Sequence, residues 1–504
     1  MLEKLAKQTA VYGISTILGR FLSYLLTPFY TRIFGVEAYG IITDVYALIP
    51  FALVLLTMGM ESGYFRFAAK AEAEVQAAAA DNPAIDIAAA VKAAKRRLFA
   101  TTWGITSLAA ILFFIVITIF RLPVSDIMGE AYAAHPEYVV IVAAIVMFDV
   151  MGCIPFSRLR EQGRAAMFVT LKMLNIVMQV GLAVAFWAIG LFDSDFGVGW
   201  AFVANLIASI VTWALVIMTA DRTLPRIDSV LLAAIFAYSL PLLISGIAGT
   251  ANEFIDRQLI KYLVPTAAMA QLGIYGAITK IAVVMTLFTQ MYRLAAEPFF
   301  LSNFKKEEFV EMNAAALKYY IIASMLIFLG ISLFKELFAL IVGSDFREGI
   351  FILPVILGAN VLSGVWLNLS FWYKREERTE LAVWVTFTGL IFTVLAGVLL
   401  IPRWGYYGAA CGRFISEAAM VVVSFILNRR LFPTPYDLRR IAFYVVSGLA
   451  VFVIGEYVVP RFADGGVKYA IDALLFAGYT AAAVKIEKID LRAMAMSIIK
   501  RKRK

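Results

Sequence analysis

The charged side chains inside apolar stretches are the residues of this sequence most able to do chemistry. The first apolar stretch, which runs to about Phe34, carries small and polar residues every three or four positions: Gly13, Thr16, Arg20, Ser23, Thr27 and Thr31. This spacing places all of them on one face of an α-helix. Arg20 would lie about 16 Å from the start of that helix, where a guanidinium needs an anion or water. Either Arg20 lines a cavity for an anionic ligand, or it pairs with Asp44 or Glu61.

Four further cations extend this candidate anion site: Lys280, Arg293, Arg413 and Arg66. Arg293 and Arg413 each precede a glutamate by four residues, Glu297 and Glu417, and this spacing favours pairing within the helix. Lys280 has no such helical partner and ranks with Arg20. Arg66 falls at the cytoplasmic end of the second predicted helix, where it either meets an incoming anion or anchors the helix.

Acidic residues near these cations are candidates for ion coupling or for salt bridges: Asp44, Glu61, Glu253, Asp256, Glu297 and Glu417. Asp44, Glu61, Glu253 and Asp256 leave open whether binding of a proton or a sodium ion is coupled to transport, or whether the membrane potential alone drives it. The single histidine, His135, and two cysteines inside apolar runs, Cys153 and Cys411, argue against a metal centre and a disulfide framework. We expect no catalytic residue and no bound cofactor.

The composition identifies the elements that must hold these residues as membrane helices. The 504 residues are 62% hydrophobic and 16% charged, with a mean hydropathy of +0.84. Soluble proteins have about 45–50% apolar and about 25% charged residues. The net charge of +9 follows from basic residues beside the apolar segments and predicts no nucleic-acid partner. The sequence therefore predicts an all-α, multi-pass membrane protein.

Apolar stretches of about 20 residues predict fourteen spans. Their centres lie near Ser23, Ala52, Ala109, Ile145, Met178, Ala208, Leu242, Val284, Ser324, Ala359, Thr388, Glu417, Leu449 and Phe476. Of the 45 Lys and Arg residues, 29 fall in the two ends of the chain and the loops after even-numbered spans, nine in the opposite loops and seven within spans. This bias places both termini in the cytoplasm, in a cell inner membrane.

Two weak echoes along the chain predict an internal repeat. Residues 35–40 (GVEAYG) resemble residues 271–276 (QLGIYG), and residues 160–164 resemble residues 374–378. The offset falls from 236 to 214, which matches an insertion at 69–97 in the first half. The echoes favour two parallel six-helix lobes with a cavity between them.

The predicted domains follow from this repeat. An N-lobe covers 1–228, a C-lobe 229–430 and a terminal helix pair 431–486, and 487–504 form a basic cytoplasmic tail. The insertion at 69–97 is either a helical extension of the third span or, over Ile85 to Ala94, an amphipathic helix on the membrane surface.

The order of the short motifs resembles the polysaccharide-transport family, the O-antigen and capsule flippases of the multidrug/oligosaccharidyl-lipid/polysaccharide exporter superfamily. The similar segments are Arg32 to Gly35 with Tyr39-Gly40, Met58 to Met60, Arg160 to Arg164, Asp256-Arg257, Gly273 to Lys280, and Glu297-Pro298. The resemblance implies alternating access, with an undecaprenyl-pyrophosphate-linked glycan moved from the inner to the outer leaflet. Such a glycan, membrane lipids and other polysaccharide-assembly proteins would be the partners, and the five cations would bind the pyrophosphate.

Three other functions compete with this interpretation. The peptidoglycan lipid II flippases of the same superfamily also use basic cavity residues, and a cation-coupled multidrug exporter would instead use unpaired acids such as Asp44 and Glu61. A membrane polysaccharide polymerase or ligase would need a large outer loop, whereas the longest predicted ones, 121–137 and 335–349, are short. No pair of carboxylates has catalytic spacing, and no nucleotide-binding motif is present, so we expect a transporter that does not use ATP directly.

Overall fold

The computed structural model describes residues 24, 26–82, 86–219, 225–304 and 308–488. Every element in these ranges is a helix, which confirms the predicted all-α class. Packing divides the chain into two units. Unit 1 comprises Met1–Gly276 and Ile401–Tyr406, and unit 2 comprises Ala277–Leu400 and Tyr407–Lys504. The predicted domain boundaries, 1–228, 229–430, 431–486 and 487–504, stay predictions.

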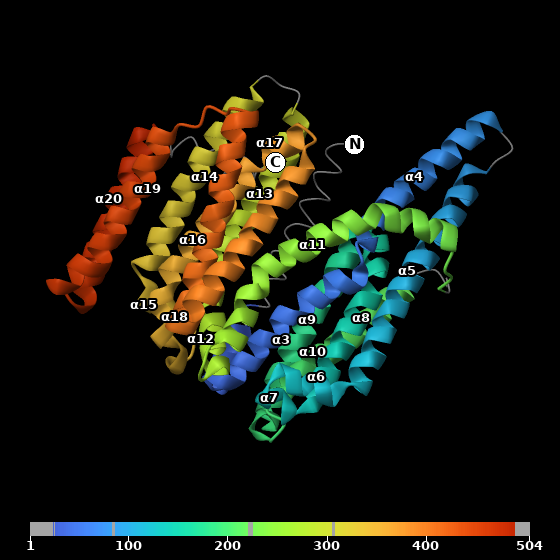
Figure 1. The fold of residues 1–504 in the computed structure, drawn as a ribbon, viewed down its shortest axis with the longest axis horizontal. Coiled ribbons are helices and arrows are strands. Elements are labelled where there is room, and N and C mark those ends of the chain that lie inside the picture. Colours follow the sequence, from blue (N-terminus) through green and yellow to red (C-terminus); the bar gives the residue numbers. More distant parts are fainter. Residues whose placement is uncertain (1–23, 25, 83–85, 220–224, 305–307, 489–504) are drawn as a thin grey trace. The chain divides into compact units, whose positions relative to one another are not determined.

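Unit 1 contains a bundle of long helices (Figure 1). They are α2 (Leu26–Ile33), α3 (Val36–Thr57), α4 (Met60–Asp81), α5 (Ile87–Ile119), α6 (Arg121–Met128), α7 (Glu130–Ala133), α8 (Pro136–Glu161), α9 (Ala165–Ala188), η1 (Leu191–Asp193), α10 (Gly199–Met218), α11 (Ser229–Leu263) and the first part of α12 (Ala268–Ile281). Helices α5, α8 and α10 pack in series, and α11 packs along α3 and α4.

Glycines allow α11 to approach the turn between α3 and α4. Met58 and Gly59 both adopt the left-handed conformation, with φ of 51° and 69°. A Cβ on Gly63 would lie 2.7 Å from side-chain atoms of Ile235 and Ser239 of α11. The Met58 to Met60 motif is therefore a tight helical turn under a crossing helix.

The two copies of the repeated motif pack against each other within unit 1. A Cβ on Gly40 of α3 would lie 2.0 Å from the carbonyl oxygen of Met269, and one on Gly273 of α12 would lie 2.0 Å from that of Val36. Only glycine permits such an approach of two backbones. The contact is reciprocal, as expected when two similar segments meet about a local two-fold axis.

Unit 2 contains the remaining helices (Figure 1). They are the end of α12, α13 (Val283–Asn303), α14 (Phe309–Ser332), α15 (Lys335–Ala339), η2 (Ser344–Ile352), α16 (Leu353–Leu369), α17 (Phe371–Arg375), most of α18 (Thr379–Leu431), α19 (Leu438–Val453), the π-helical turn η3 (Ile454–Val458), η4 (Val459–Arg461) and α20 (Gly465–Ile486). Helix α18 is two helices joined at Gly405, whose φ of 54° and ψ of −134° are not helical.

The described residues contain eleven helices long and apolar enough to cross a membrane, or twelve if the bent pair α12 and α13 is one span. The predicted count of fourteen is not confirmed. The centres near Thr388 and Glu417 both fall in α18, and the one near Val284 falls on the bent pair. The first centre, Ser23, lies outside the described residues. The chain is a multi-pass membrane protein.

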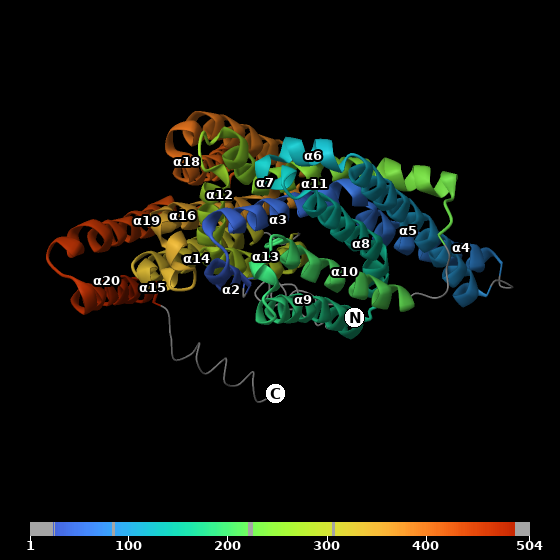
Figure 2. The same cartoon turned by 90° about the horizontal axis from the view of Figure 1, so that it is seen from below.

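The described parts of the insertion, 69–82 and 86–97, form helical extensions of two spans. Helix α4 continues to Asp81, and α5 runs without a break from Ile87 to Ile119, with Asp86 capping its start. Residues 87–94 thus belong to the helix that enters the apolar span, whereas Ile85 lies outside the described residues and contact of this segment with the membrane surface stays a prediction. Lys95 bonds to Glu72 of α4 and to Glu161 of α8, each at 2.8 Å, and the extensions lie side by side in both views (Figure 2).

Candidate functional site

The most strongly bonded charge inside unit 1 is the carboxylate of Asp44. Asp44 is fully buried in α3. It accepts hydrogen bonds from Lys261 Nζ at 2.5 Å, Gln258 Nε2 at 2.6 Å and the hydroxyl of Tyr132 at 2.7 Å. Lys261 is also buried, and its ammonium lies 4.7 Å from the centre of the Tyr132 ring. A buried ion pair is tolerated when further hydrogen bonds satisfy the remaining lone pairs, and Asp44 meets this condition.

Three elements position this site. Gln258 and Lys261 are three residues apart on one face of α11, and Tyr132 comes from the short helix α7. The sequence analysis gave Asp44 as one alternative partner of Arg20, which lies outside the described residues; the described partner of Asp44 is Lys261, 217 residues away along the chain. The sequence analysis missed Lys261. No local signal could have found it, because its partner is distant in the sequence.

A second buried pair lies one turn earlier in α11. Asp256 is 3% exposed and accepts hydrogen bonds from the hydroxyl of Tyr275 at 2.5 Å and from Arg257 Nη1 at 3.3 Å. Arg257 also donates to the carbonyl of Glu253 at 3.1 Å, whereas the Glu253 side chain is exposed. The Asp256-Arg257 motif is thus an ion pair held by the tyrosine of the second motif copy.

The predicted site residues of α4 are more exposed. Glu61 accepts hydrogen bonds from Cys153 Sγ at 3.0 Å and Ser157 Oγ at 3.4 Å. Arg66 is exposed, and its guanidinium lies 4.1 Å from the centre of the Tyr238 ring of α11. Among the described residues Arg66 forms no ion pair, and its guanidinium is held by an aromatic ring.

The predicted cations of unit 2 have several environments. Arg293 pairs with Glu297 at 3.6 Å, which confirms the expected pairing, and Lys374 pairs with the same carboxylate. The Arg293 side chain is 59% exposed. Lys280 and Arg413 are half-buried and Glu417 is buried. The expected pairing of Arg413 with Glu417 stays a prediction.

The predicted cation set is divided between the units. Arg66 belongs to unit 1, and Lys280, Arg293 and Arg413 belong to unit 2. Arg20 lies outside the described residues. Two later members of its predicted stripe, Thr27 and Thr31, are buried, as expected for a face turned from lipid. Binding of pyrophosphate by these cations stays a prediction.

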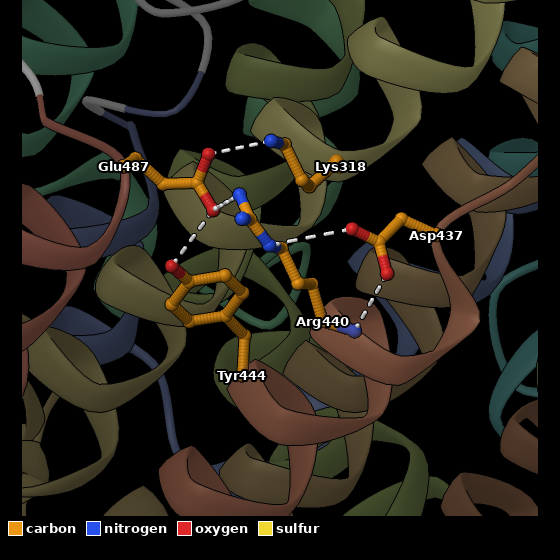
Figure 3. A network of polar contacts seen from close by, with 5 residues as sticks. All are labelled: Lys318, Asp437, Arg440, Tyr444 and Glu487. Carbon is orange, nitrogen blue, oxygen red and sulfur yellow. Dashed lines mark hydrogen bonds and ion pairs between the residues drawn. The ribbon is translucent and has the colours of Figure 1, made fainter.

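An ionic network in unit 2 joins α20 to α14 and α19 (Figure 3). Glu487 accepts hydrogen bonds from Lys318 at 2.5 Å, Tyr444 at 3.0 Å and Arg440 at 3.2 Å, and Arg440 also pairs with Asp437 at 3.4 Å. Desolvation would raise the pKa of Glu487, but the bonds from Lys318 and Tyr444 and the nearby cations outweigh it and lower this pKa. The network fixes the end of the terminal helix.

No group of three or more His, Cys, Asp or Glu side chains suited to a metal occurs in the part of the chain that the structure describes. What the arrangement offers is a set of cations and paired charges carried by apolar helices.

The fold is similar to those of solved membrane proteins, among them a transporter of the multidrug/oligosaccharidyl-lipid/polysaccharide exporter superfamily. A structure titled lipid II flippase MurJ, inward closed conformation, matches 95% of this chain and 100% of its own with a TM-score of 0.72 at 11% identity. An inward-facing multidrug resistance MATE family transporter of that superfamily matches 82% of this chain and 94% of its own, with a TM-score of 0.65 at 16% identity. These similarities establish the fold.

The chain belongs to the family described as polysaccharide biosynthesis protein, whose model matches residues 5–304. A probable low-salt glycan biosynthesis flippase, Agl15 of Haloferax volcanii, is 22% identical over 43% of this chain and 46% of its own. The capsular polysaccharide biosynthesis protein CapF of Staphylococcus aureus is 26% identical over 39% of this chain and 50% of its own. The chain thus spans about half the length of these curated relatives. The predicted family is confirmed.

Proposed function

We propose that the chain moves a polyprenyl-pyrophosphate-linked oligosaccharide from the inner to the outer leaflet of the cytoplasmic membrane, for surface polysaccharide synthesis. The observation that carries the proposal is that a chain of the polysaccharide biosynthesis family holds cations, such as Lys280 and Arg413, within its membrane helices. A cation at mid-membrane costs at least about 2.5–3.5 kcal/mol, and an anionic headgroup offsets that cost.

The chemistry of the cargo explains this arrangement. A diphosphate carries about two negative charges, which the hydrocarbon core excludes, whereas its polyprenyl tail is soluble there. The protein therefore needs to bind only the headgroup and expose it to each side in turn. Lys and Arg suit this task because both bind phosphate oxygens with charge-assisted hydrogen bonds.

The direction of transport follows from the charge of the cargo. With a negative cell interior, outward movement of each uncompensated negative charge is favoured by about 2.3 kcal/mol per 100 mV. We therefore expect both termini to be cytoplasmic and the membrane potential to contribute to the driving force. Exchange of a proton or a sodium ion would add to it.

The test is to remove the protein from its host and to identify the lipid-linked glycans on each membrane face. We expect a polyprenyl-pyrophosphate glycan to accumulate on the inner face and wild-type protein to restore its export. Lys280→Ala and Arg413→Ala should restore export poorly, while Lys92→Ala, which changes an exposed lysine of the α5 extension, should restore it fully.

Other outcomes would assign a different function. Accumulation of lipid II on the inner face would identify a peptidoglycan-precursor flippase, which the similar fold of the MurJ structure also allows. Unchanged glycans with lost drug resistance would identify a multidrug exporter.

A further inference from the structure

Asp472 of α20 is a buried carboxyl group without a hydrogen-bond partner. It is fully buried, and neither Oδ1 nor Oδ2 has a hydrogen-bond partner among the described residues. Glu487, just after the opposite end of the same helix, shows the usual solution, since three residues donate to its carboxylate. The contrast makes Asp472 an exception that needs a physical explanation.

The carboxyl group of Asp472 lies beside Gly455, in a π-helical turn. A Cβ on Gly455 would lie 2.8 Å from Asp472 Oδ1 and 2.4 Å from Leu333 Cδ2. Gly455 lies in η3, where α19 widens for one turn. Such single π-turns often occur at functional sites. The missing side chain of Gly455 leaves room for the carboxyl group between α14, α20 and η3.

Four other charged residues lie near this position, and they form two ion pairs. Lys335 of α15 pairs with Glu456 of η3, and Lys468 of α20 pairs with Glu336 of α15 at 3.2 Å. Asp472 has electrostatic interactions with Lys468, Glu336 and Glu456. The two lysines neutralise the two glutamates, so an ionised Asp472 would be the uncompensated charge of the five.

The other elements packed against α20 add no cation at this position. Arg461 of η4 is exposed, and Lys318 and Arg440, of α14 and α19, bind Glu487 at the far end. An isolated carboxylate in such surroundings costs several kcal/mol, and a bound proton removes that charge.

We propose that Asp472 forms a proton-binding site on the terminal helix of the chain, separate from the cations assigned to the cargo. The site lies about 10 Å along α20 from its start at Gly465, at the end of the helix that the charge bias places on the outer side. Its ligand is a proton, which neutralises the cluster. The site goes beyond the proposed function and does not depend on the identity of the cargo.

Infrared spectroscopy of the purified full-length chain in lipid nanodiscs tests the site directly. We expect a protonated-carboxyl C=O band at neutral pH that shifts when aspartate is labelled with ¹³C and disappears reversibly at alkaline pH. The band should be lost in Asp472→Asn and kept in Asp464→Asn, which changes an exposed aspartate beside the same helix. A band that is absent from the wild type, or that persists in Asp472→Asn, would overturn the proposal.

A thermal measurement separates a proton from a metal cation. The midpoint of unfolding, Tm, is compared in sodium and in choline buffers of equal ionic strength. We expect no sodium-dependent difference in the wild type or in Asp472→Asn. A rise in Tm with sodium that Asp472→Asn abolishes would show a sodium site instead, and would contradict the proposal. If Asp472→Asn does not fold, Asp472→Glu decides, because its protonated-carboxyl band should no longer shift when aspartate is labelled with ¹³C.

Discussion

We propose that single charges inside the membrane determine what this chain binds. Arg20, Lys280 and Arg413 occur in apolar segments, and the family to which the chain belongs handles polysaccharides. Two buried charge pairs, Asp44 with Lys261 and Asp256 with Arg257, are bonded within unit 1. We interpret these pairs as scaffold, and the cations outside them as the groups that meet the cargo.

Replacing the deep cations should stop transport. We expect Arg20→Ala to abolish export of the lipid-linked glycan and Lys280→Ala to reduce it at least tenfold. Without these positive charges, the negative charge of the diphosphate would have no counter-charge, and the apolar core would exclude it. Export is measured as surface polysaccharide at matched protein levels. Wild-type output from Arg20→Ala would contradict the assignment of Arg20 as a cargo-binding residue.

Replacing Lys261 should destabilise the protein. Lys261→Met leaves Asp44 buried with its charge unmatched, and breaking such a pair costs about 3–5 kcal/mol. The double variant Asp44→Asn with Lys261→Met should recover most of that loss, which a double-mutant cycle of unfolding in detergent measures. Lys172→Met is the control: that lysine is exposed and lies over the Phe156 ring at 4.3 Å, so its loss should cost only about 0.5–1 kcal/mol. Equal losses in the two lysine variants would refute the role of the buried pair.

At the scale of elements, close backbone contacts and helix ends hold the spans in place. Gly40 and Gly273 bring α3 and α12 together, and Gln271 Oε1 accepts a hydrogen bond from the Tyr406 amide at 3.1 Å, next to the break in α18. Three residues of one short motif and its copy thus fix three helices of unit 1.

A methyl group at the motif contact should prevent folding. In Gly273→Ala the added carbon would lie 2.0 Å from the Val36 carbonyl oxygen, which the helices can relieve only by moving apart. We expect a large loss of folded protein, measured by fluorescence-detected gel filtration. In Gly35→Ala nothing lies within 4 Å of the added carbon, so this variant should yield wild-type amounts. Normal yield from Gly273→Ala would show that the contact is not required.

Acid should release the end of α20. Because the pKa of Glu487 is lowered in the folded chain, its bonds stabilise the protein above the unfolded-state value of about 4.3 and are lost as pH falls through the folded-state value. The difference in Tm between wild type and Glu487→Gln should therefore be constant near pH 7, should shrink once the pH falls below about 4.3, and should vanish below the lowered folded-state pKa. A difference in Tm that grows as the pH falls would contradict the stabilising role of the ionised Glu487.

Features of these elements that depend on the local sequence could be predicted, whereas contacts between distant residues could not. Apolar length and charge bias predicted the helical class, most spans and the α5 extension. Lys261 was missed because its partner Asp44 is 217 residues away, and no local spacing connects them. Asp472 follows Lys468 by four residues, a spacing that usually indicates a pair, yet Lys468 bonds to Glu336. Long-range partner choice is set by packing, which periodicity does not encode.

For the whole molecule, the electrical potential is the quantity to vary. If the cargo leaves with uncompensated negative charge, collapsing an inside-negative potential of 100 mV removes about 2.3 kcal/mol per charge from the driving force. We expect outward transport in reconstituted vesicles to slow when valinomycin and equal potassium concentrations abolish the potential. Transport that is indifferent to the potential but sensitive to a pH gradient would indicate charge-compensating exchange.

Helices α12 and α18 each contribute residues to both units, so the units share continuous helical backbone at 276/277, 400/401 and 406/407. In the alternating-access cycle that we propose, a conformational change at these positions must bend or twist a helix, because no flexible loop is available to absorb it. Pro402 lacks the amide hydrogen of a helical hydrogen bond, and Gly405 already has a non-helical φ of 54°. Helix α18 can therefore bend at residues 402–405 with little loss of free energy. A substitution that makes residues 402–405 more rigid, and changes no charged residue, should lower the rate of transport without lowering the affinity for the cargo.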